Sequence, residues 1–209
     1  MSVILAQCEL SLSDPETSVS SRTAFLTIQR QGKRMSRLIN DMLDYTRLEM
    51  RPDRYPKQNV DLSALTTSLC DDMALIRQQG IQLTADIQPE INIYGNPQLL
   101  SRLVTNLISN AYRYGKENGH ILVRLHSNDT GVSERRSLSL SVEDDGIGIS
   151  KEEQKHIFQR FYQVDPSRSG AGTGLGLSMV QQIAEFHNGT VTVKSAPGDG
   201  SIFTVLMFL

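Results

Sequence analysis

The chain has 209 residues and a nearly balanced charge, with 21 basic and 23 acidic residues for a formal net charge of −2. This balance provides no basic field, which argues against nucleic-acid binding and against a polybasic membrane tether. Cys8 and Cys70 have no CxxC spacing and no nearby histidine, which argues against a zinc site and a disulfide scaffold. No apolar run approaches the roughly 20 residues that span a bilayer, and the first residues lack the features of a signal peptide, so we expect a soluble fragment.

The first 50 residues predict two helices. Residues 2–10 form a short helix that starts without a cap, and residues 20–50 carry apolar side chains three and four positions apart, as in a bundle or coiled-coil seam. A helix of about 30 residues would be about 45 Å long, which exceeds the width of a small domain. We therefore favour a helical hairpin that pairs with a second copy over an amphipathic helix packed on its own domain.

Residues 51–57 contain two prolines and several charges, and we interpret them as a linker. Beyond the linker, helices and strands alternate without a strict βαβ repeat. Strands are expected near 59–61, 81–87, 91–94, 120–127, 137–144, 190–194 and 201–206. Helices are expected from 62 toward Gly80, at 97–114, after Ser150 and at 175–187. Loops are expected at 128–136 and 167–172. This order predicts a second domain over 58–209, with a mixed sheet and helices on one face.

The strand predicted at 137–144 runs directly into a glycine-broken acidic turn, Asp144-Asp145-Gly146-Ile147-Gly148. We interpret Asp144 as the edge of an adenine pocket, because Gly146 and Gly148 allow the main chain to approach a flat ligand closely. An Asp-x-Gly-x-Gly segment also occurs in ordinary turns. The interpretation therefore depends on further motifs.

Two asparagines four residues apart, Asn106 and Asn110, fall on one face of the helix predicted at 97–114. Asparagine is a poor helix former, so the pair is either two surface amides or part of a site. As a site, the amide oxygens could ligate Mg²⁺, a hard cation that bridges nucleotide phosphates. Arg113, one turn beyond Asn110, could then reach a phosphate oxygen.

Glycines are concentrated in Gly170-Ala-Gly172-Thr173-Gly174-Leu175-Gly176, where the helix predicted at 175–187 begins. Main-chain N–H groups in such a segment, together with the unpaired donors of a helix start, favour a bound phosphate; the alternative is a flexible hinge. The aromatic segment Phe158-Gln-Arg160-Phe161-Tyr162 precedes this loop. It could form a core patch, or it could anchor a lid over a nucleotide.

The chain resembles the catalytic ATP-binding domain of sensor histidine kinases over about residues 58–209. The resemblance rests on four motifs in this order: the asparagine pair, the Asp-x-Gly-x-Gly turn, the Phe-x-x-Phe segment and the Gly-Thr-Gly-Leu-Gly loop. The resemblance implies an α+β fold, a two-layer α/β sandwich of the Bergerat ATP-binding type shared with the gyrase and MutL ATPases. It also implies ATP and Mg²⁺ as cofactors. Asn106, Asn110 and Arg113 would be catalytic, the two asparagines holding the metal, while Asp144 would accept a hydrogen bond from the adenine amino group.

The resemblance extends the expected nucleotide site to further positions. Tyr114 would flank the base, and Arg113 and Arg160 would contact phosphates. The remaining candidate contacts are Gly146, Gly148 and Ile149 in the acidic turn and Gly172, Thr173, Gly174, Leu175 and Gly176 in the glycine-rich loop.

Residues 1–50 are similar to part of the dimerisation and phosphotransfer hairpin of the same family, in the segment Met35-Ser-Arg-Leu-Ile-Asn-Asp-Met-Leu-Asp-Tyr-Thr-Arg-Leu-Glu49. This similarity implies a homodimer, a response-regulator receiver domain as partner, and no direct membrane contact within this cytoplasmic portion of a membrane-anchored bacterial sensor. The family carries its phosphoacceptor in a His-Glu-Leu-like box of the first helix. Here the histidines are His120, His126, His156 and His187, all in the other domain, so we expect the fragment to bind ATP without phosphorylating itself.

Two positions depart from the family pattern. Gln163 stands where many relatives carry a basic residue, and Arg102 stands near the place where hydrolysing relatives keep a glutamate base. Without a water-activating carboxylate, phosphoryl transfer to a histidine is favoured over hydrolysis. The predicted function is the core of an ATP-dependent protein-histidine kinase. The alternatives are an ATP hydrolase of the gyrase or MutL kind and a non-catalytic nucleotide-binding or dimerisation module.

Overall fold

The computed structural model describes residues 2–14, 18–75, 80–127, 137–164 and 172–208. The elements in chain order are α1 (Ser2–Ser13), α2 (Val19–Met50), η1 (Pro52–Arg54), β1 (Gln58–Asp61), α3 (Leu62–Ala74), β2 (Gln82–Ile87), β3 (Asn92–Gly95), α4 (Pro97–Tyr114), β4 (His120–Ser127), β5 (Ser137–Asp144), α5 (Lys151–Gln154), α6 (Gly176–Phe186), β6 (Gly189–Ser195) and β7 (Ser201–Phe208). The predicted alternation is confirmed, with ends shifted by a few residues. The loop predicted at 128–136, and all but Gly172 of the loop predicted at 167–172, lie outside the described residues.

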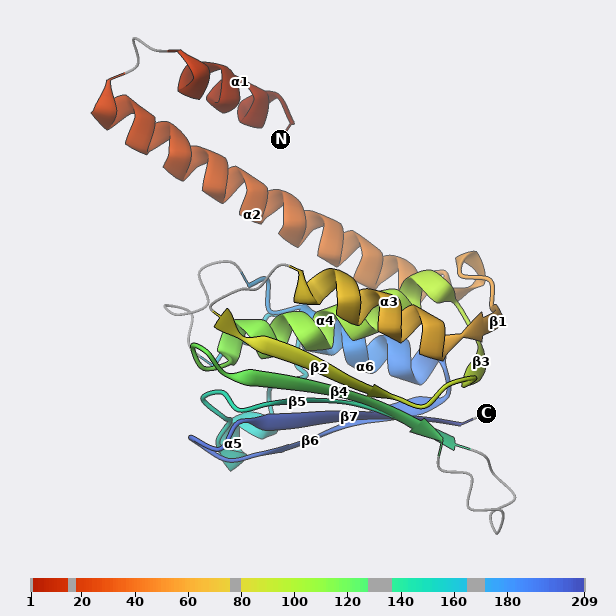
Figure 1. Cartoon of the computed structure of the whole chain (residues 1–209). Coiled ribbons are helices and arrows are strands. Elements are labelled where there is room, and N and C mark those ends of the chain that lie inside the picture. The colour runs from red at the N-terminus through yellow and green to blue at the C-terminus, as the bar shows by residue number, and fades with distance from the viewer. Residues whose placement is uncertain (1, 15–17, 76–79, 128–136, 165–171, 209) are drawn as a thin grey trace.

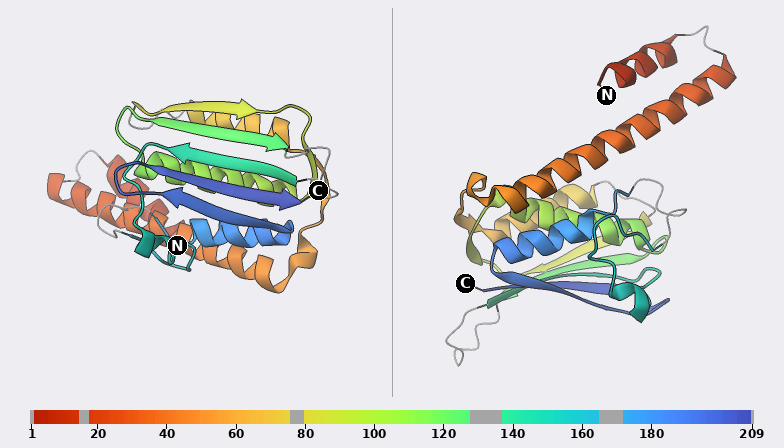
Figure 2. Two further views of the ribbon diagram at one scale, coloured as in Figure 1. Left: turned by 90° about the horizontal axis from the view of Figure 1, so that it is seen from below. Right: turned by 180° about the vertical axis from the view of Figure 1, so that it is seen from behind.

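Five strands form a mixed sheet in the order β2-β4-β5-β7-β6, in which β2 and β4 are parallel and the other neighbours antiparallel. Helices α3, α4 and α6 cover one face, and the view from below shows the opposite face uncovered (Figures 1 and 2). The expected two-layer α/β sandwich after a helical hairpin is therefore confirmed. Strands β1 and β3, which we expected in the mixed sheet, instead form a separate antiparallel pair at the end of the helical layer.

The core lies between the sheet and the helical layer, and α4 is its central helix. The β5 side chains alternate in exposure, so that Leu138, Leu140 and Val142 point into the core. Helix α4 begins as expected at Asn96, whose side chain accepts a hydrogen bond from the Leu99 N–H, with proline in the first turn. Leucines on one face of α4 are almost fully buried, and each such burial contributes roughly 1.5 to 3 kcal/mol.

The hairpin projects away from the sandwich. Helix α1 lies along the distal part of α2, and the C-terminal half of α2 crosses the helical layer (Figures 1 and 2). Along α2, Met35, Ile39, Met42 and Leu43 are 45 to 56% exposed, an apolar stripe of the kind that a helical partner covers. In the described part of the chain, no helix has both the length and the apolar character that a membrane crossing demands.

Truncation of Leu103 tests the assignment of the core. This α4 side chain is fully buried, so Leu103→Ala should remove contacts and leave a cavity, lowering the free energy of unfolding by about 2 to 5 kcal/mol. Leu75→Ala is the matched control, because Leu75 is 82% exposed and its truncation should change stability by less than about 0.5 kcal/mol. Urea unfolding followed by circular dichroism measures both, and equal losses would contradict the assignment.

Candidate functional site

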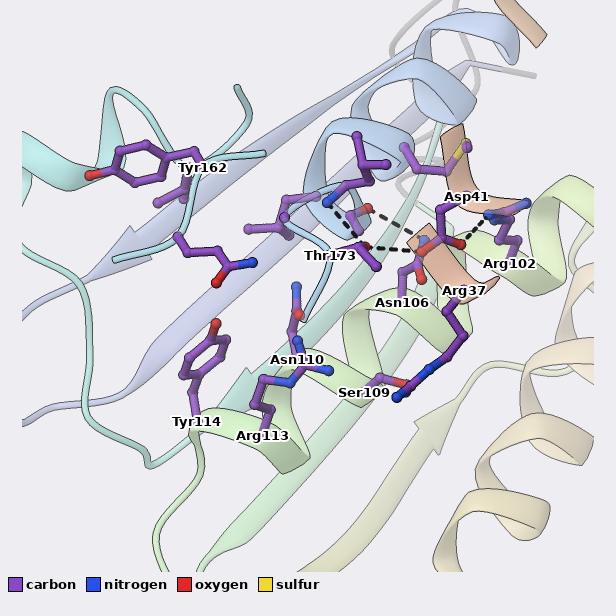
Figure 3. Close-up of a pocket in the computed structure, with 17 residues that line it drawn as sticks. Arg37, Asp41, Arg102, Asn106, Ser109, Asn110, Arg113, Tyr114, Tyr162 and Thr173 are labelled. Carbon is purple, nitrogen blue, oxygen red and sulfur yellow. Dashed lines mark hydrogen bonds and ion pairs between the residues drawn. The ribbon is translucent and has the colours of Figure 1, made fainter. Parts of the chain in front are cut away.

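Two adjoining cavities open between α4, the start of α6 and the end of β5. The larger has a volume of about 300 Å³ and is lined by polar and charged side chains, including Asn106, Asn110 and Arg113 (Figure 3). The smaller has a volume of about 70 Å³ and contains Asp144 among mostly apolar groups. They share the lining residues Asn110, Tyr114, Ile157, Tyr162, Gln163 and Leu177. The two cavities therefore form one continuous site with an apolar end and a polar end.

Asp144 is the last residue of β5, and the strand delivers its carboxylate into the apolar end. The side chain is only 6% exposed, and its Oδ1 accepts a hydrogen bond of 2.9 Å from the Gly146 N–H. Burial raises the pKa of Asp144 from 3.8 to about 6, against the lowering effect of the Gly146 bond. A partly desolvated carboxylate at the floor of an apolar cavity is suited to accept a hydrogen bond from a flat, amine-bearing ligand.

The glycines after Asp144 permit close backbone contacts. A Cβ on Gly146 would lie 2.1 Å from the Tyr114 carbonyl oxygen. Gly148 has φ of +69°, and a Cβ there would lie 1.8 Å from the Ala196 carbonyl oxygen. The Ile147 N–H also donates to the Tyr114 carbonyl oxygen at 3.1 Å. The acidic turn is therefore fixed against the end of α4, and Tyr114, Gly148 and Ile149 line the apolar end together.

Helix α4 turns its polar face toward the larger cavity. Asn106, Asn110 and Arg113 recur at helical spacing, and all three line it, as the spacing predicted. The Asn106 amide nitrogen donates to the Gly176 carbonyl oxygen at 3.4 Å. This contact uses the nitrogen, which cannot bind a cation, so the oxygen is the atom that could ligate Mg²⁺.

The glycine-rich segment forms the opposite wall. Thr173, Gly174, Leu175 and Gly176 line the larger cavity, while the Gly172 carbonyl oxygen accepts a hydrogen bond from the Gln163 amide at 3.0 Å. Gly174 has φ of +72°, and a Cβ there would overlap the Phe161 backbone. Among the described residues no side chain caps the start of α6, so the first N–H groups of this helix are suited to bind an anion.

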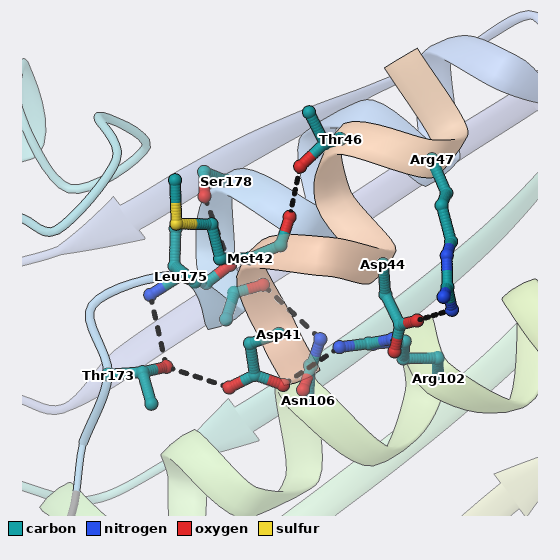
Figure 4. Close-up of polar contacts among 11 residues, drawn as sticks. Asp41, Met42, Asp44, Thr46, Arg47, Arg102, Asn106, Thr173, Leu175 and Ser178 are labelled. Carbon is teal, nitrogen blue, oxygen red and sulfur yellow. Dashed lines mark hydrogen bonds and ion pairs between the residues drawn. The ribbon is translucent and has the colours of Figure 1, made fainter. Parts of the chain in front are cut away.

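Two side chains from the hairpin also line the larger cavity, Arg37 and Asp41 of α2. Asp41 Oδ1 accepts a bond of 2.8 Å from Arg102, and its Oδ2 accepts one of 3.0 Å from the Thr173 hydroxyl (Figure 4). Asp44 contacts the other terminal nitrogen of Arg102 at 2.5 Å. Nothing in the pattern of α2 had indicated these contacts, because helical periodicity specifies a face and not its partner.

The candidate residues divide into three groups by position. Asn106, Asn110, Arg113, Tyr114 and the segment 173–176 line the larger cavity, and Asp144, Gly148 and Ile149 line the smaller one. Gly146 and Gly172 line neither cavity but are hydrogen-bonded to the lining residues Asp144 and Gln163. Arg160 lies apart: it pairs with Glu49 of α2 at 2.7 Å and stacks over the Tyr45 ring at 4.3 Å from the ring centroid.

Comparisons with known proteins match both parts of the chain. The family model for histidine kinase-, DNA gyrase B- and HSP90-like ATPases matches residues 95–209, and the model for the His kinase A (phospho-acceptor) domain matches residues 1–51. The chain is 38% identical over 196 residues to the sensor histidine kinase RppB of Synechocystis sp., covering 92% of this chain and 42% of RppB. It is 32% identical over 212 residues to the sensor-like histidine kinase SenX3 of Mycolicibacterium smegmatis, covering 98% of this chain and 52% of SenX3. The chain thus spans about half the length of these relatives.

Solved structures share the fold. Full-length ShkA in complex with AMPPNP matches with a TM-score of 0.79 at 24% identity, covering 98% of this chain and 42% of ShkA. The histidine kinase AdeS of Acinetobacter baumannii matches with a TM-score of 0.68 at 22% identity, covering 98% of this chain and 93% of AdeS. The likeness therefore includes the hairpin as well as the sandwich.

The burial of Asp144 predicts a pH-dependent difference in stability. The pKa of Asp144 is raised in the folded state, so the folded chain holds this proton more tightly than the unfolded chain does. The resulting contribution to the free energy of unfolding is fully present below a pH of about 4 and is lost as the pH rises through about 6. Asp144→Asn cannot ionise and keeps an oxygen for the Gly146 N–H. The variant should therefore gain stability relative to the parent as the pH rises from about 4 to about 7, by roughly 1 to 3 kcal/mol.

Urea unfolding at several pH values measures this difference. Asp72→Asn serves as the control, because Asp72 is an exposed carboxylate on α3, and its stability difference from the parent should not grow in the same way. A difference between Asp144→Asn and the parent that stays constant across this pH range would contradict the prediction.

Proposed function

The chain belongs to the histidine kinase-, DNA gyrase B- and HSP90-like ATPases, and with its His kinase A domain it forms the core of a two-component sensor histidine kinase; from this premise we propose that it binds ATP with Mg²⁺. In the whole protein, the γ-phosphoryl group is transferred to a histidine and relayed to an aspartate of a response regulator. The observation that carries this proposal is the continuous site, with a buried carboxylate at its apolar end and amide, guanidinium and glycine groups at its polar end.

The apolar end suits adenine. Asp144 accepts a hydrogen bond from the exocyclic amino group, and the Tyr114 ring and Ile149 flank the base. The carboxylate is buried, and the backbone of Gly146 and of Ser201 already donates to it, so a ligand that lacks the amino group would leave its cavity-facing acceptor position without a donor. The AMPPNP complex of the structural relative ShkA supports a nucleotide as the ligand of this fold.

The polar end suits the polyphosphate and its metal. Arg113 and the N–H groups of Gly174 and Gly176 bind phosphate oxygens, and the Asn106 and Asn110 oxygens hold Mg²⁺. The described residues contain no cluster of three or more His, Cys, Asp or Glu side chains suited to a metal, so the remaining ligands come from phosphates and water. When bound, Mg²⁺ neutralises the charge that develops on the transferred phosphoryl group.

The hairpin supplies the dimer. The exposed stripe of α2 formed by Met35, Ile39, Met42 and Leu43 packs against a second copy of the chain, as the match to the His kinase A domain favours. The response-regulator receiver domain is the expected partner for phosphoryl relay. His187 of the sandwich has a structural position: it is buried, and its Nε2 accepts a hydrogen bond from the Asn96 N–H.

A gyrase-like hydrolase is the competing function, and the carboxylate at the larger cavity favours the kinase over it. Hydrolysis requires a base beside the attacking water. Among the described lining residues of the larger cavity, the carboxylate is Asp41, and both of its oxygens are engaged by Arg102 and Thr173. Neither oxygen is placed to take a proton from water, so transfer to a delivered imidazole is favoured.

Binding of the ATP analogue AMPPNP tests the nucleotide site. Asp144→Asn should weaken binding roughly 10- to 100-fold, because a hydrogen bond to a charged group is lost. Omission of Mg²⁺ should weaken AMPPNP binding by the parent but leave adenosine binding unchanged. Isothermal titration calorimetry measures each affinity, with Asp72→Asn as the control. Weak binding by the parent with no dependence on Mg²⁺ would instead indicate a non-catalytic module.

Incubation with γ-labelled ATP tests the reaction class. We expect neither stable label on the chain nor steady release of phosphate, because residues 1–50 contain no histidine and the carboxylate among the described lining residues is already engaged. Label is measured after electrophoresis under alkaline conditions, which preserve phosphohistidine, and phosphate by a coupled assay. Label on His120, His126, His156 or His187 would overturn the expectation, and phosphate release abolished by Asp144→Asn would favour a hydrolase.

A further inference from the structure

Helix α2 contacts two candidate phosphate residues, of which Thr173 lines the larger cavity and Arg160 lies outside it. Asp41 accepts hydrogen bonds from Arg102 and from the Thr173 hydroxyl, at 2.8 and 3.0 Å (Figure 4). Some two turns further along α2, Glu49 pairs with Arg160 at 2.7 Å. Thr173 and Arg160 are both candidate phosphate-side residues. In this structure each of them is bound instead to a carboxylate of the hairpin.

These contacts come from one face of α2. Asp41, Asp44, Tyr45 and Glu49 are separated by helical spacings, and buried Leu48 lies on the same side. Asp44 is the second partner of Arg102, and Tyr45 stacks against Arg160. The contacts therefore form or break together, as α2 docks on the sandwich or leaves it.

A carboxylate at this position opposes a polyphosphate. Asp41 lines the same cavity as Asn106, Asn110 and Arg113, where the phosphates of a nucleotide would lie (Figure 3). Like charges that share a partly buried cavity repel each other, so the Asp41 carboxylate disfavours a phosphate placed beside it. The Asp41 bond also holds the Thr173 hydroxyl, which in turn accepts a hydrogen bond from the Leu175 N–H at 3.4 Å. The phosphate-side loop is thus held in place by an anion of the hairpin.

We propose that the α2 carboxylates Asp41 and Glu49 act as internal competitors of the nucleotide phosphates, so that docking of α2 and binding of a triphosphate oppose each other. The inference rests on the proposed nucleotide site and adds its regulation. Binding of Mg²⁺ and triphosphate releases α2 from the sandwich, and docking of α2 weakens triphosphate binding by the same factor, because coupling between two sites is reciprocal.

The coupling has a limited size. The Arg160 and Glu49 side chains are about half exposed, and such pairs change an equilibrium by less than about fivefold. The pairs of Arg102 are more buried, with side-chain exposures of 26 to 35%. Together the contacts bias α2 toward the docked position without closing the site to a tightly bound nucleotide.

Neutralisation of the two competitors tests the proposal. The double variant Asp41→Asn, Glu49→Gln keeps side-chain shape and leaves Arg102 paired with Asp44. It should bind Mg²⁺ and AMPPNP roughly 3- to 10-fold more tightly than the parent, because the docked state is weakened, and adenosine equally well, because adenosine has no phosphates. Asp53→Asn is the matched control: Asp53 lies in the linker, is 67% exposed and pairs with Arg51.

The calorimetric outcomes separate this inference from the proposed function. Equal AMPPNP affinities of the parent and the double variant would overturn the inference alone. Weaker Mg²⁺-dependent binding by the double variant would also overturn it, since Asp41 would then be a metal ligand. Failure of both proteins to bind AMPPNP would overturn the proposed function together with the inference.

A fluorescent side chain reports the movement of α2 directly. The chain contains no tryptophan, so Tyr45→Trp introduces a single one, and an indole can still stack on Arg160. Addition of Mg²⁺ and AMPPNP should shift its emission to longer wavelength as the indole enters water, whereas adenosine should leave the emission unchanged. An emission spectrum unaffected by saturating AMPPNP would overturn the release of α2.

Discussion

Helix α4 packs against the hydrophobic core on one face and lines the larger cavity on the other, and the candidate site depends on this two-sided arrangement. One face buries Leu103, Leu107 and Ile108 against the sheet, while the other face presents Asn106 and Asn110 to the larger cavity. Core packing leaves little freedom to rotate the helix about its axis, because a small rotation would expose leucine and bury amide groups. The hydrophobic core therefore fixes the positions of the polar side chains that face the ligand.

In the acidic turn, by contrast, a residue of the candidate site lowers the stability of the fold. Burial of Asp144 raises its pKa to about 6, so the ionised carboxylate is less favourable in the folded chain than in water. The surrounding backbone allows little adjustment: a Cβ on Gly200 would lie 1.9 Å from the Asp144 carbonyl oxygen. A desolvated acceptor with a fixed position discriminates strongly between ligands, because only a matching donor satisfies it. Local instability and ligand specificity thus have the same physical origin.

The sequence predicted the features that depend on local chemistry or on short repeats. The cap at Asn96, the alternation of β5, and the shared face of Asn106 and Asn110 follow from period and residue type, and the structure confirms them. The separate pairing of β1 with β3 was not predictable, because strand propensity does not select a partner. Arg37 and Asp41 were missed for a similar reason: they reach the cavity through the docking of α2, which brings together residues more than 60 positions apart. The roles of the site residues remain predictions.

The docked position of α2 requires only weak contacts, because the linker keeps its partners close. The linker ends firmly on the sandwich, where the Asn96 amide donates to the Pro56 carbonyl oxygen at 3.0 Å and Lys57 Nζ donates to the Phe186 carbonyl oxygen at 2.8 Å. Only the short stretch from Arg51 to Tyr55 separates that anchor from the end of α2. Tethering at this distance gives an effective concentration in the millimolar range, so ion pairs too weak to join separate chains suffice here. A charged ligand that binds at the same site can displace ion pairs of this strength. It could not displace α2 if a large apolar interface held this helix on the sandwich.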